Sequence, residues 1–161
     1  MEKLWAPWRL EYVSRVGNAE ACVFCAEAAD TLGEDSLVVH RSDHAFVVLN
    51  RYPYASGHVL VCPYRHIAGL DDLTSDEAPA IHALTVEALA VIRRVYGPDA
   101  FNVGWNLGAV AGGSIAAHLH EHVVPRWAGD TNFMPVLADV KVVPEHLATS
   151  RDRLRAAWPA C

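Results

Sequence analysis

The residues best suited to chemistry are three histidines that alternate with other residues. His118, His120 and His122 lie in the segment 117–124, which is written AHLHEHVV. If this segment is a β-strand, its side chains alternate between two faces, so all three imidazoles project from one face about 7 Å apart. Rings at this spacing can converge on one substrate group or on one metal ion.

Three interpretations of this histidine row stay open on the residues alone. The row could be the solvated face of a strand. It could be a three-histidine metal site, because imidazole is the commonest metal ligand. It could also carry out covalent catalysis, in which one imidazole attacks the substrate while its neighbours orient both.

A second group with possible chemistry is the pair Cys22 and Cys25, which are separated by two residues. This spacing suits either a metal site or a redox pair. Cys62 lies in the apolar segment VLVCP, where we expect it to pack as a small apolar residue. Cys161 is the last residue and is assigned no function. Four dispersed cysteines do not make a disulfide scaffold.

A glycine-bearing loop, 107–114, precedes the histidine row and ends in Gly112-Gly113-Ser114. Glycine permits close backbone approach, and exposed N–H groups together with the Ser114 hydroxyl can bind phosphate oxygens. A Gly-Gly-Ser sequence alone is more often a turn, but here it lies four residues before His118.

The elements that would position these residues are short strands and one long helix. Thr74 and Glu77 form a capping box, and apolar residues then recur at helical spacing until Gly97-Pro98 ends the helix. A final helix is expected over about 144–158, with Arg151, Arg153 and Arg155 facing outward. The predicted strands are 44–49, 58–62, 101–106 and 117–124. This order indicates an α+β fold with a mainly antiparallel sheet, one long helix and a C-terminal helix.

Length and composition set the class of protein. The chain has 161 residues, and we expect one domain over 1–161, with an extension over 1–20, a core over about 20–130 and a C-terminal segment over 131–161. Thirteen Lys+Arg against nineteen Asp+Glu give a net charge of −6, which with no basic cluster argues against binding polymeric nucleic acid. The apolar runs are too short to span a bilayer, and charged residues interrupt the first segment of the chain. We therefore expect no membrane-spanning segment, no signal peptide and a cytoplasmic location.

Together these motifs resemble a known family. The segment 118–124 is similar to the His-φ-His-φ-His-φ-φ signature (φ, apolar) of the histidine-triad nucleotide hydrolases and transferases. In the same order as in that family stand Asn50-Arg51-Tyr52-Pro53, Gly57-His58-Val59-Leu60-Val61-Cys62-Pro63, Asn106-Leu107-Gly108, Gly112-Gly113-Ser114 and Pro125-Arg126. The opening LWAPWR and the ending Pro125-Arg126-Trp127 resemble the bacterial branch that contains diadenosine polyphosphate phosphorylases and hydrolases.

The resemblance implies nucleotidyl transfer through a covalent nucleotidyl-histidine. His120 would attack the α-phosphorus, its other ring nitrogen being held by the carbonyl of His118, while His122 steadies the charge on oxygen. Inorganic phosphate or water would resolve the intermediate. The implied substrate-binding residues are Asn50, His58, Asn106, Gly113, Ser114 and Trp127. Asn50 and His58 are expected near the sugar and base, and Trp127 either stacks on a base or anchors the strand end.

The resemblance also implies a structural zinc site. The ligands would be Cys22, Cys25, His66 and His118, a tetrahedral set with no open position. No organic cofactor is expected, and the family habit is a homodimer formed through the long helix and the adjacent strand. His40, His44, His82 and His146 are expected to be surface or satisfied polar residues.

One residue departs from the signature, because Glu121 stands where the family has an apolar residue. A buried unpaired carboxylate is costly, so we expect Glu121 to be paired with a base or to lie near solvent. Two alternatives to dinucleoside polyphosphate cleavage also remain. One is an adenosine phosphoramidase, and the other is a nucleotide-binding module without catalysis.

Overall fold

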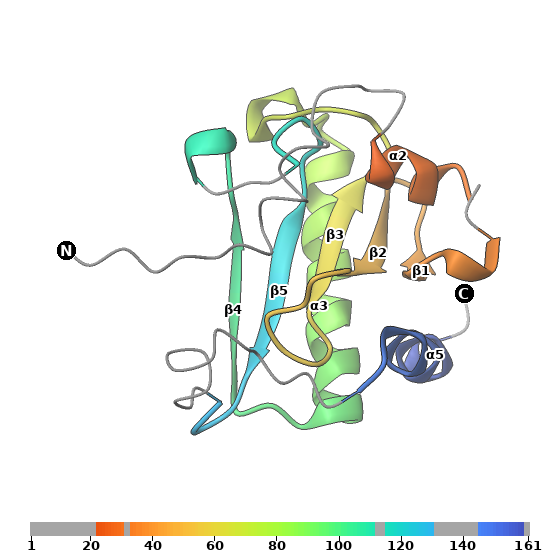
Figure 1. Cartoon of the computed structure of the whole chain (residues 1–161). Coiled ribbons are helices and arrows are strands. Elements are labelled where there is room, and N and C mark those ends of the chain that lie inside the picture. The colour runs from red at the N-terminus through yellow and green to blue at the C-terminus, as the bar shows by residue number, and fades with distance from the viewer. Residues whose placement is uncertain (1–21, 31–32, 112–114, 131–144, 160–161) are drawn as a thin grey trace.

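A computed structural model describes residues 22–30, 33–111, 115–130 and 145–159. Its centre is a five-stranded sheet in the order β1-β2-β3-β5-β4, with every neighbouring pair antiparallel (Figure 1). The strands are β1 (Val38–Arg41), β2 (Ala45–Leu49), β3 (Val59–Pro63), β4 (Ala100–Trp105) and β5 (Glu121–Arg126). The helices are α2 (Val23–Ala28), α3 (Glu77–Tyr96) and α5 (Leu147–Ala157), with 3₁₀ turns η2 (Gly33–Asp35), η3 (Leu70–Asp72) and η4 (Ala109–Ala111).

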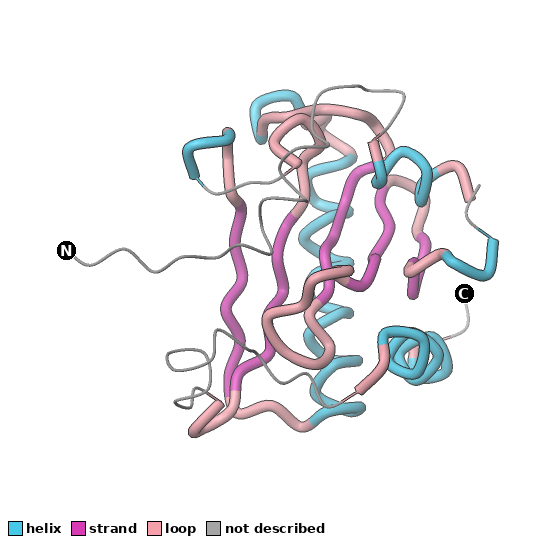
Figure 2. Tube along the Cα trace, viewed as in Figure 1, coloured by secondary structure: helices cyan, strands magenta, loops and turns pink. Residues whose placement is uncertain are grey.

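The α+β fold expected from the sequence is confirmed, including the long helix and the C-terminal helix (Figure 2). Two elements were not predicted, strand β1 and the short helix α2. The predicted strand over 117–124 is partly wrong, because β5 begins at Glu121 and a turn occupies 115–117. The physical reason is that Leu119 N–H donates to the carbonyl of Ile67, at 2.6 Å, so this residue pairs with a loop and not with a strand.

Helix α3 forms where its end signals and its apolar spacing agree. Glu77 N–H donates to Thr74 Oγ1 at 3.2 Å, while Thr74 N–H donates to the Glu77 carboxylate at 2.9 Å, so the predicted capping box is present. Gly97 ends the helix in the left-handed conformation with φ of 58°, which glycine adopts without strain. The helix buries Ile81, Leu84, Thr85, Ala88, Val91 and Ile92.

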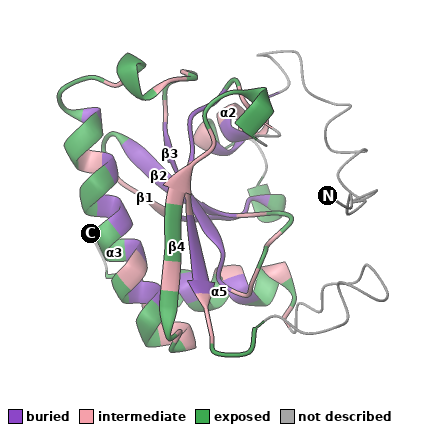
Figure 3. Ribbon diagram, turned by 90° about the vertical axis from the view of Figure 1, so that its left-hand side faces the viewer, coloured by how far each residue is buried: buried purple, intermediate pink, exposed green. Residues whose placement is uncertain are grey.

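Helix α3 covers one face of the sheet, and the short helix α2 lies over one end of the opposite face (Figures 1 and 3). Buried residues line the side of α3 that meets the sheet, and exposed residues line the other side (Figure 3). Strand β4 at the open edge is largely exposed, whereas β2 and β3 are buried throughout. Cys62 is fully buried in β3, as expected for a small apolar residue.

Helix α5 packs against the β1 edge of the sheet and against α3, with Leu154 fully buried between them. Arg155 donates to the carbonyl of Val38 at 2.8 Å, and Arg151 donates to the carbonyl of Ser36 at 3.2 Å. Arg153 and Arg155 are exposed, as expected, whereas Arg151 is half-buried, so the expectation that all three face outward is wrong only for Arg151. The guanidinium groups of Arg151 and Arg155 supply hydrogen bonds to carbonyls at the edge of the sheet, which a strand partner would otherwise satisfy.

The departure at Glu121 is accommodated by a hydroxyl. Thr85 Oγ1 on α3 donates to Glu121 Oε2 at 2.5 Å, and Glu121 is half-buried. The expected pairing with a base is thus replaced by a hydrogen bond between the sheet and the helix behind it. Among the described residues, no helix is both long and apolar enough to cross a membrane.

We predict that Glu77→Gln lowers the free energy of unfolding by about 1–2 kcal/mol at pH 7. The ion pair with Arg65, at 2.6 Å, and the Thr74 bonds lower the pKa of Glu77 to about 2. Because this is below the ordinary value near 4.3, the stabilisation is present above about pH 4.3 and is lost as pH falls toward 2. Urea unfolding between pH 7 and pH 2.5 measures both effects.

The matched control for this prediction is Asp76→Asn. Asp76 is exposed at the start of the same helix, and its side chain makes no capping hydrogen bond. Its substitution should change the free energy of unfolding by less than about 0.5 kcal/mol. Equal effects of the two substitutions would show that the capping box does not stabilise α3.

Candidate active site and metal cluster

The three histidines of the row are held by two different kinds of backbone. His118 and His120 precede β5, whereas His122 lies within β5 and pairs with Leu60 on one side and Gly104 on the other. The rings of His120 and His122 are still adjacent, with their centroids 5.0 Å apart. The rings of His120 and His122 therefore lie side by side although β5 starts only at Glu121. The ring of His118 instead faces Cys22 and Pro63.

The hydrogen bond that orients His120 is local. His120 Nδ1 lies 2.8 Å from the backbone carbonyl oxygen of His118. A carbonyl can only accept, so Nδ1 carries the proton and Nε2 of the neutral ring carries a lone pair. Burial lowers the pKa of His120 and outweighs the hydrogen bond to His118, which raises it. The net effect favours the neutral ring. This arrangement gives an imidazole prepared for nucleophilic attack.

The proton on His122 is placed by a chain of hydrogen bonds that begins in the loop 50–57. The backbone N–H of Tyr54 donates to His58 Nδ1 at 3.1 Å. His58 Nε2 then carries the proton and donates to His122 Nδ1 at 3.0 Å. In a neutral His122 the remaining proton lies on Nε2, 3.3 Å from Asn106 Nδ2, and turning the Asn106 amide by 180° puts its oxygen there to accept that proton. His122 can thus donate to an oxygen at this point.

Burial keeps the ring of His122 neutral. His58 is fully buried, and Tyr54 stacks over it with ring centroids 5.0 Å apart. Burial, with the neighbouring His120, lowers the pKa of His122 to about 4. At pH 7 the row therefore acts through placed protons and lone pairs and not through positive charge.

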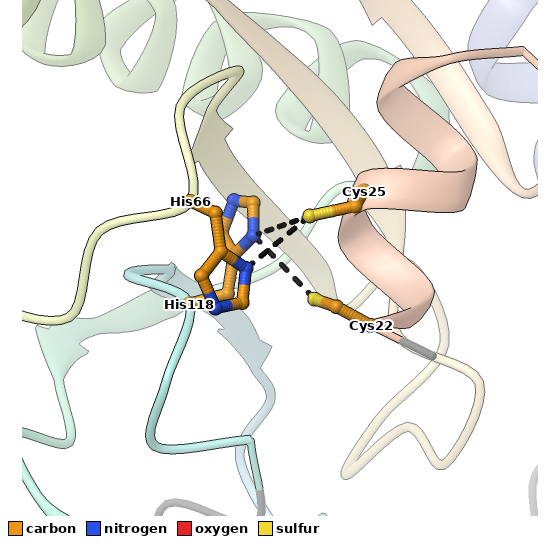
Figure 4. A group of neighbouring side chains, drawn as sticks. All are labelled: Cys22, Cys25, His66 and His118. Atoms are coloured by element: carbon orange, nitrogen blue, oxygen red, sulfur yellow. Dashed lines mark hydrogen bonds between the residues drawn. The ribbon is translucent and has the colours of Figure 1, made fainter. Parts of the chain in front are cut away.

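A second cluster lies beside the row and consists of Cys22, Cys25, His66 and His118 (Figure 4). One ligand atom from each lies within 4.8 Å of the others. Cys25 Sγ is 3.2 Å from His66 Nδ1, and Cys22 Sγ is 3.5 Å from His118 Nδ1. A tetrahedral metal with bonds of about 2.0–2.3 Å separates its ligands by roughly 3.3–3.8 Å. The cluster could hold a metal ion.

The position of the proton on the His118 ring agrees with a role as metal ligand. His118 Nε2 donates to the carbonyl oxygen of Pro63 at 3.0 Å, so Nδ1 presents a lone pair toward both sulfurs. Burial lowers the pKa of His118 to about 4, which also favours the neutral ligand form. Burial and the neighbouring Cys22 raise the pKa of Cys25 to about 11, an effect that a cation between the sulfurs would reverse.

Helix α2 connects the cluster to the sheet and to His120. Buried Glu27 accepts from Ser36 Oγ at 2.7 Å and from Leu37 N–H at 3.2 Å. Arg41 on β1 donates to the last carbonyls of α2, those of Glu27 and Ala28. Phe24, between the two cysteines, contacts the rings of both His118 and His120, with centroids 5.4 and 5.0 Å away. The cluster thus supports the row through one aromatic ring.

The remaining residues that the sequence singled out have different positions. Asn106 is beside His122, as described. Asn50 accepts from Tyr52 N–H at 3.0 Å and so closes a turn, while His58 is buried behind His122 and not at an open surface. Trp127 is half-buried in the turn after β5. Gly113 and Ser114 lie outside the described residues, so their phosphate contacts stay a prediction.

Sequence reasoning missed Tyr54 and Phe24. Tyr54 covers the rings of His58 and His122, and its centroid lies 6.3 Å from that of His122. An aromatic residue four positions before a histidine gives no distinctive signal, because the loop must fold back for the two to meet. Phe24 had a usable signal in its place between the cysteines.

Comparison with known proteins decides the family. The protein-family model described as "HIT domain" matches residues 32–129, which is more than half of the chain. The chain belongs to the HIT family. The resemblance seen in the histidine row and its flanking motifs is confirmed.

Two named relatives show which members of the family this chain resembles. A protein of Mycobacterium tuberculosis named "AP-4-A phosphorylase" is 41% identical over 165 residues, covering 98% of this chain and 85% of the relative. A Schizosaccharomyces pombe protein named "Bis(5'-nucleosyl)-tetraphosphatase [asymmetrical]" is 34% identical over 95 residues, covering 59% of this chain and 52% of the relative. This HIT-family chain is thus similar over almost its whole length to a phosphorylase.

Solved structures agree with the fold. A Zn-bound histidine triad family protein from Mycobacterium smegmatis has a TM-score of 0.69 at 26% identity, over 88% of this chain and 95% of that one. A HIT-like protein from Bartonella henselae has a TM-score of 0.70 at 20% identity, over 88% and 99% of the two chains, and this likeness concerns the fold alone.

We predict that the cluster binds one Co²⁺ per chain, with the thiolate-to-metal absorption of a tetrahedral site. Cys25→Ser should weaken binding by about tenfold or more and reduce that absorption, because a hydroxyl is a poor substitute for a thiolate. Cys62→Ala is the control, since Cys62 is a buried thiol outside the cluster. Cobalt titration followed by absorbance measures both, and an unchanged spectrum in Cys25→Ser would contradict the ligand assignment.

Proposed function

We propose that this HIT-family protein transfers a nucleotidyl group from a dinucleoside polyphosphate, with diadenosine tetraphosphate as the favoured substrate. The observation that carries the proposal is the His120 Nδ1 hydrogen bond to the His118 carbonyl, which leaves Nε2 as a free nucleophile in a neutral ring. The similarity to the M. tuberculosis phosphorylase supports the substrate class. The acceptor is inorganic phosphate or water, and that similarity favours phosphate.

The first step joins His120 to the substrate. Nε2 attacks the α-phosphorus, the N–P bond forms, and the bond from that phosphorus to the bridging oxygen breaks. The electron pair leaves on the nucleoside polyphosphate, and His122 Nε2–H donates a hydrogen bond to the departing oxygen. Fixed donors of this kind suit phosphoryl chemistry, which depends chiefly on positioning and charge stabilisation.

The second step releases the nucleotide. An oxygen of phosphate or of water attacks the same phosphorus and the N–P bond breaks, so His120 regains its lone pair. Phosphate yields a nucleoside diphosphate, while water yields a nucleoside monophosphate and a proton. Throughout both steps His58 is a positioning residue, because it reaches the reaction only through His122.

The substrate would be held by residues around the row. Asn106 lies beside His122 and can contact the phosphate chain. The proposal also retains Asn50, Trp127, Gly113 and Ser114 as substrate contacts, and His58 in the positioning role described above. No organic cofactor enters either step.

We further propose that Cys22, Cys25, His66 and His118 hold a structural zinc ion. Two thiolates and two imidazoles complete a tetrahedron without an open position, so the ion would stabilise the fold and not touch the substrate. A site of this kind needs reduced thiols, which fits a cytoplasmic protein.

The homodimer expected from the family is also proposed. Strand β4 is an exposed sheet edge, and it carries Val103, which is 46% exposed. Val86 on the exposed side of α3 is 53% exposed. Pairing of this edge and this helix with a second copy would cover both side chains.

We predict that diadenosine tetraphosphate with phosphate yields ADP and ATP in equal amounts. Transfer of the adenylyl group to phosphate gives ADP, and the leaving half is ATP. Anion-exchange chromatography of the products, with and without phosphate, measures the acceptor. Formation of AMP and ATP without phosphate would identify a hydrolase, and turnover only of adenosine 5′-phosphoramidate would identify a phosphoramidase. Binding of the nucleotide without any product would contradict the enzymatic proposal.

We predict that His120→Ala lowers kcat by at least about 10³-fold while nucleotide affinity changes little, because the substitution removes the nucleophile. His82→Ala is the matched control, since His82 is an exposed histidine on α3. The control should keep full activity. Steady-state kinetics and calorimetric binding of AMP test both variants, and activity retained in His120→Ala would overturn the role of this residue.

A further inference from the structure

Gly104 lies inside a strand, at a position where neither the backbone conformation nor the packing requires a glycine. It lies in β4, which pairs with β5 along six residues without a bulge. Its φ is outside the left-handed region, and a Cβ built on it would meet no atom of the described residues within 4 Å. Glycine weakens a strand, and where neither backbone nor packing requires it, it often marks a close approach by a ligand or another backbone.

The position of Gly104 favours the ligand. It pairs directly with His122, so both face the same side of the sheet. The other sides of His122 are occupied: His58 lies behind one ring nitrogen, Asn106 beside the other, and His120 and Tyr54 lie at its ring. On the side of His122 that faces β4, the neighbouring residue is Gly104, which has no side chain to cover the imidazole.

Further along β4, the same face remains open to solvent. Asn102, two residues from Gly104 on the same face, is exposed, and its Oδ1 accepts a hydrogen bond from Arg126 Nη1 at 2.8 Å. The surface beside Gly104 is therefore polar, and Ala100 lies at the far end of β4, beyond Asn102 and outside this surface. A polyphosphate chain leaving from His122 Nε2 can pass over this surface without displacing an apolar side chain.

We propose that Gly104 determines leaving-group specificity by providing the floor of the passage for the departing nucleoside polyphosphate. This inference rests on the proposed function, because it assumes that His120 takes the adenylyl group and His122 faces the departing oxygen. The adenylyl half lies on the His120 side and does not cross Gly104. A side chain at this position would obstruct a bulky leaving group and leave a small one unaffected.

Two substrates with the same transferred group test this proposal in the full-length chain. Diadenosine tetraphosphate releases ATP, whereas adenosine 5′-phosphoramidate releases only ammonia. Gly104→Val should lower kcat/KM for the tetraphosphate by about tenfold or more and change that for the phosphoramidate by less than about twofold. Gly104→Ala should give an intermediate loss. Ala100→Val is the matched control, because it adds bulk to the same face of β4 away from His122, and it should leave both substrates unaffected.

Each other outcome overturns the proposal. Equal losses for both substrates in Gly104→Val would show a general effect on the strand or on His122, and no loss for either would show that the passage lies elsewhere. A change in molar mass by light scattering would assign the glycine to contact with a second copy. Lack of tetraphosphate turnover by the unsubstituted chain would remove the proposed function as well, so the two failures are distinguishable.

Discussion

The site depends on His118, a single residue that serves two groups at once. Its carbonyl oxygen holds His120 Nδ1 at 2.8 Å, while its ring faces Cys22 and Cys25 and is fixed from behind by Pro63. The backbone that orients the proposed nucleophile is therefore anchored by the ring of the same residue. Any loosening of the cysteine cluster would be transmitted to His120 over one residue, without a longer path through the fold.

Neutrality of the imidazoles is the second constraint. Burial lowers the pKa of His118, His120 and His122, so none needs a carboxylate to set its protonation. Their hydrogen-bond partners are instead carbonyls, another imidazole, the Asn106 amide and the cysteine sulfurs. A carboxylate beside His120 would favour the cationic ring and remove the lone pair that is proposed to attack phosphorus. Glu121, the acidic residue that departs from the signature, instead accepts a hydrogen bond from Thr85 on the far face of the sheet.

Much of this arrangement was predictable from sequence, because it depends on local rules. The capping box at Thr74 and the glycine end of α3 follow from spacing and residue type, whereas His66 and His118 were added to the cysteine pair by the family resemblance. The start of β5 was not predictable, since it depends on a hydrogen bond between Leu119 and Ile67, which are 52 positions apart (119 − 67). Strand β1 is short and, among the described strands, pairs with β2 on one side only, while Arg155 of α5 reaches its Val38 carbonyl from the other end of the chain. The role of Tyr54 depends on how its loop folds back.

The covering of β1 by α5 also has a consequence for assembly. Arg151 and Arg155 occupy carbonyls along one margin of the sheet, whereas β4 at the opposite margin is exposed over much of its length. A sheet with two bare margins can add copies indefinitely, as fibrils do. With one edge closed by its own helix, the proposed association through β4 would use the same strand on both copies and would leave no exposed edge for a third. In that assembly the C-terminal helix would limit association to two copies.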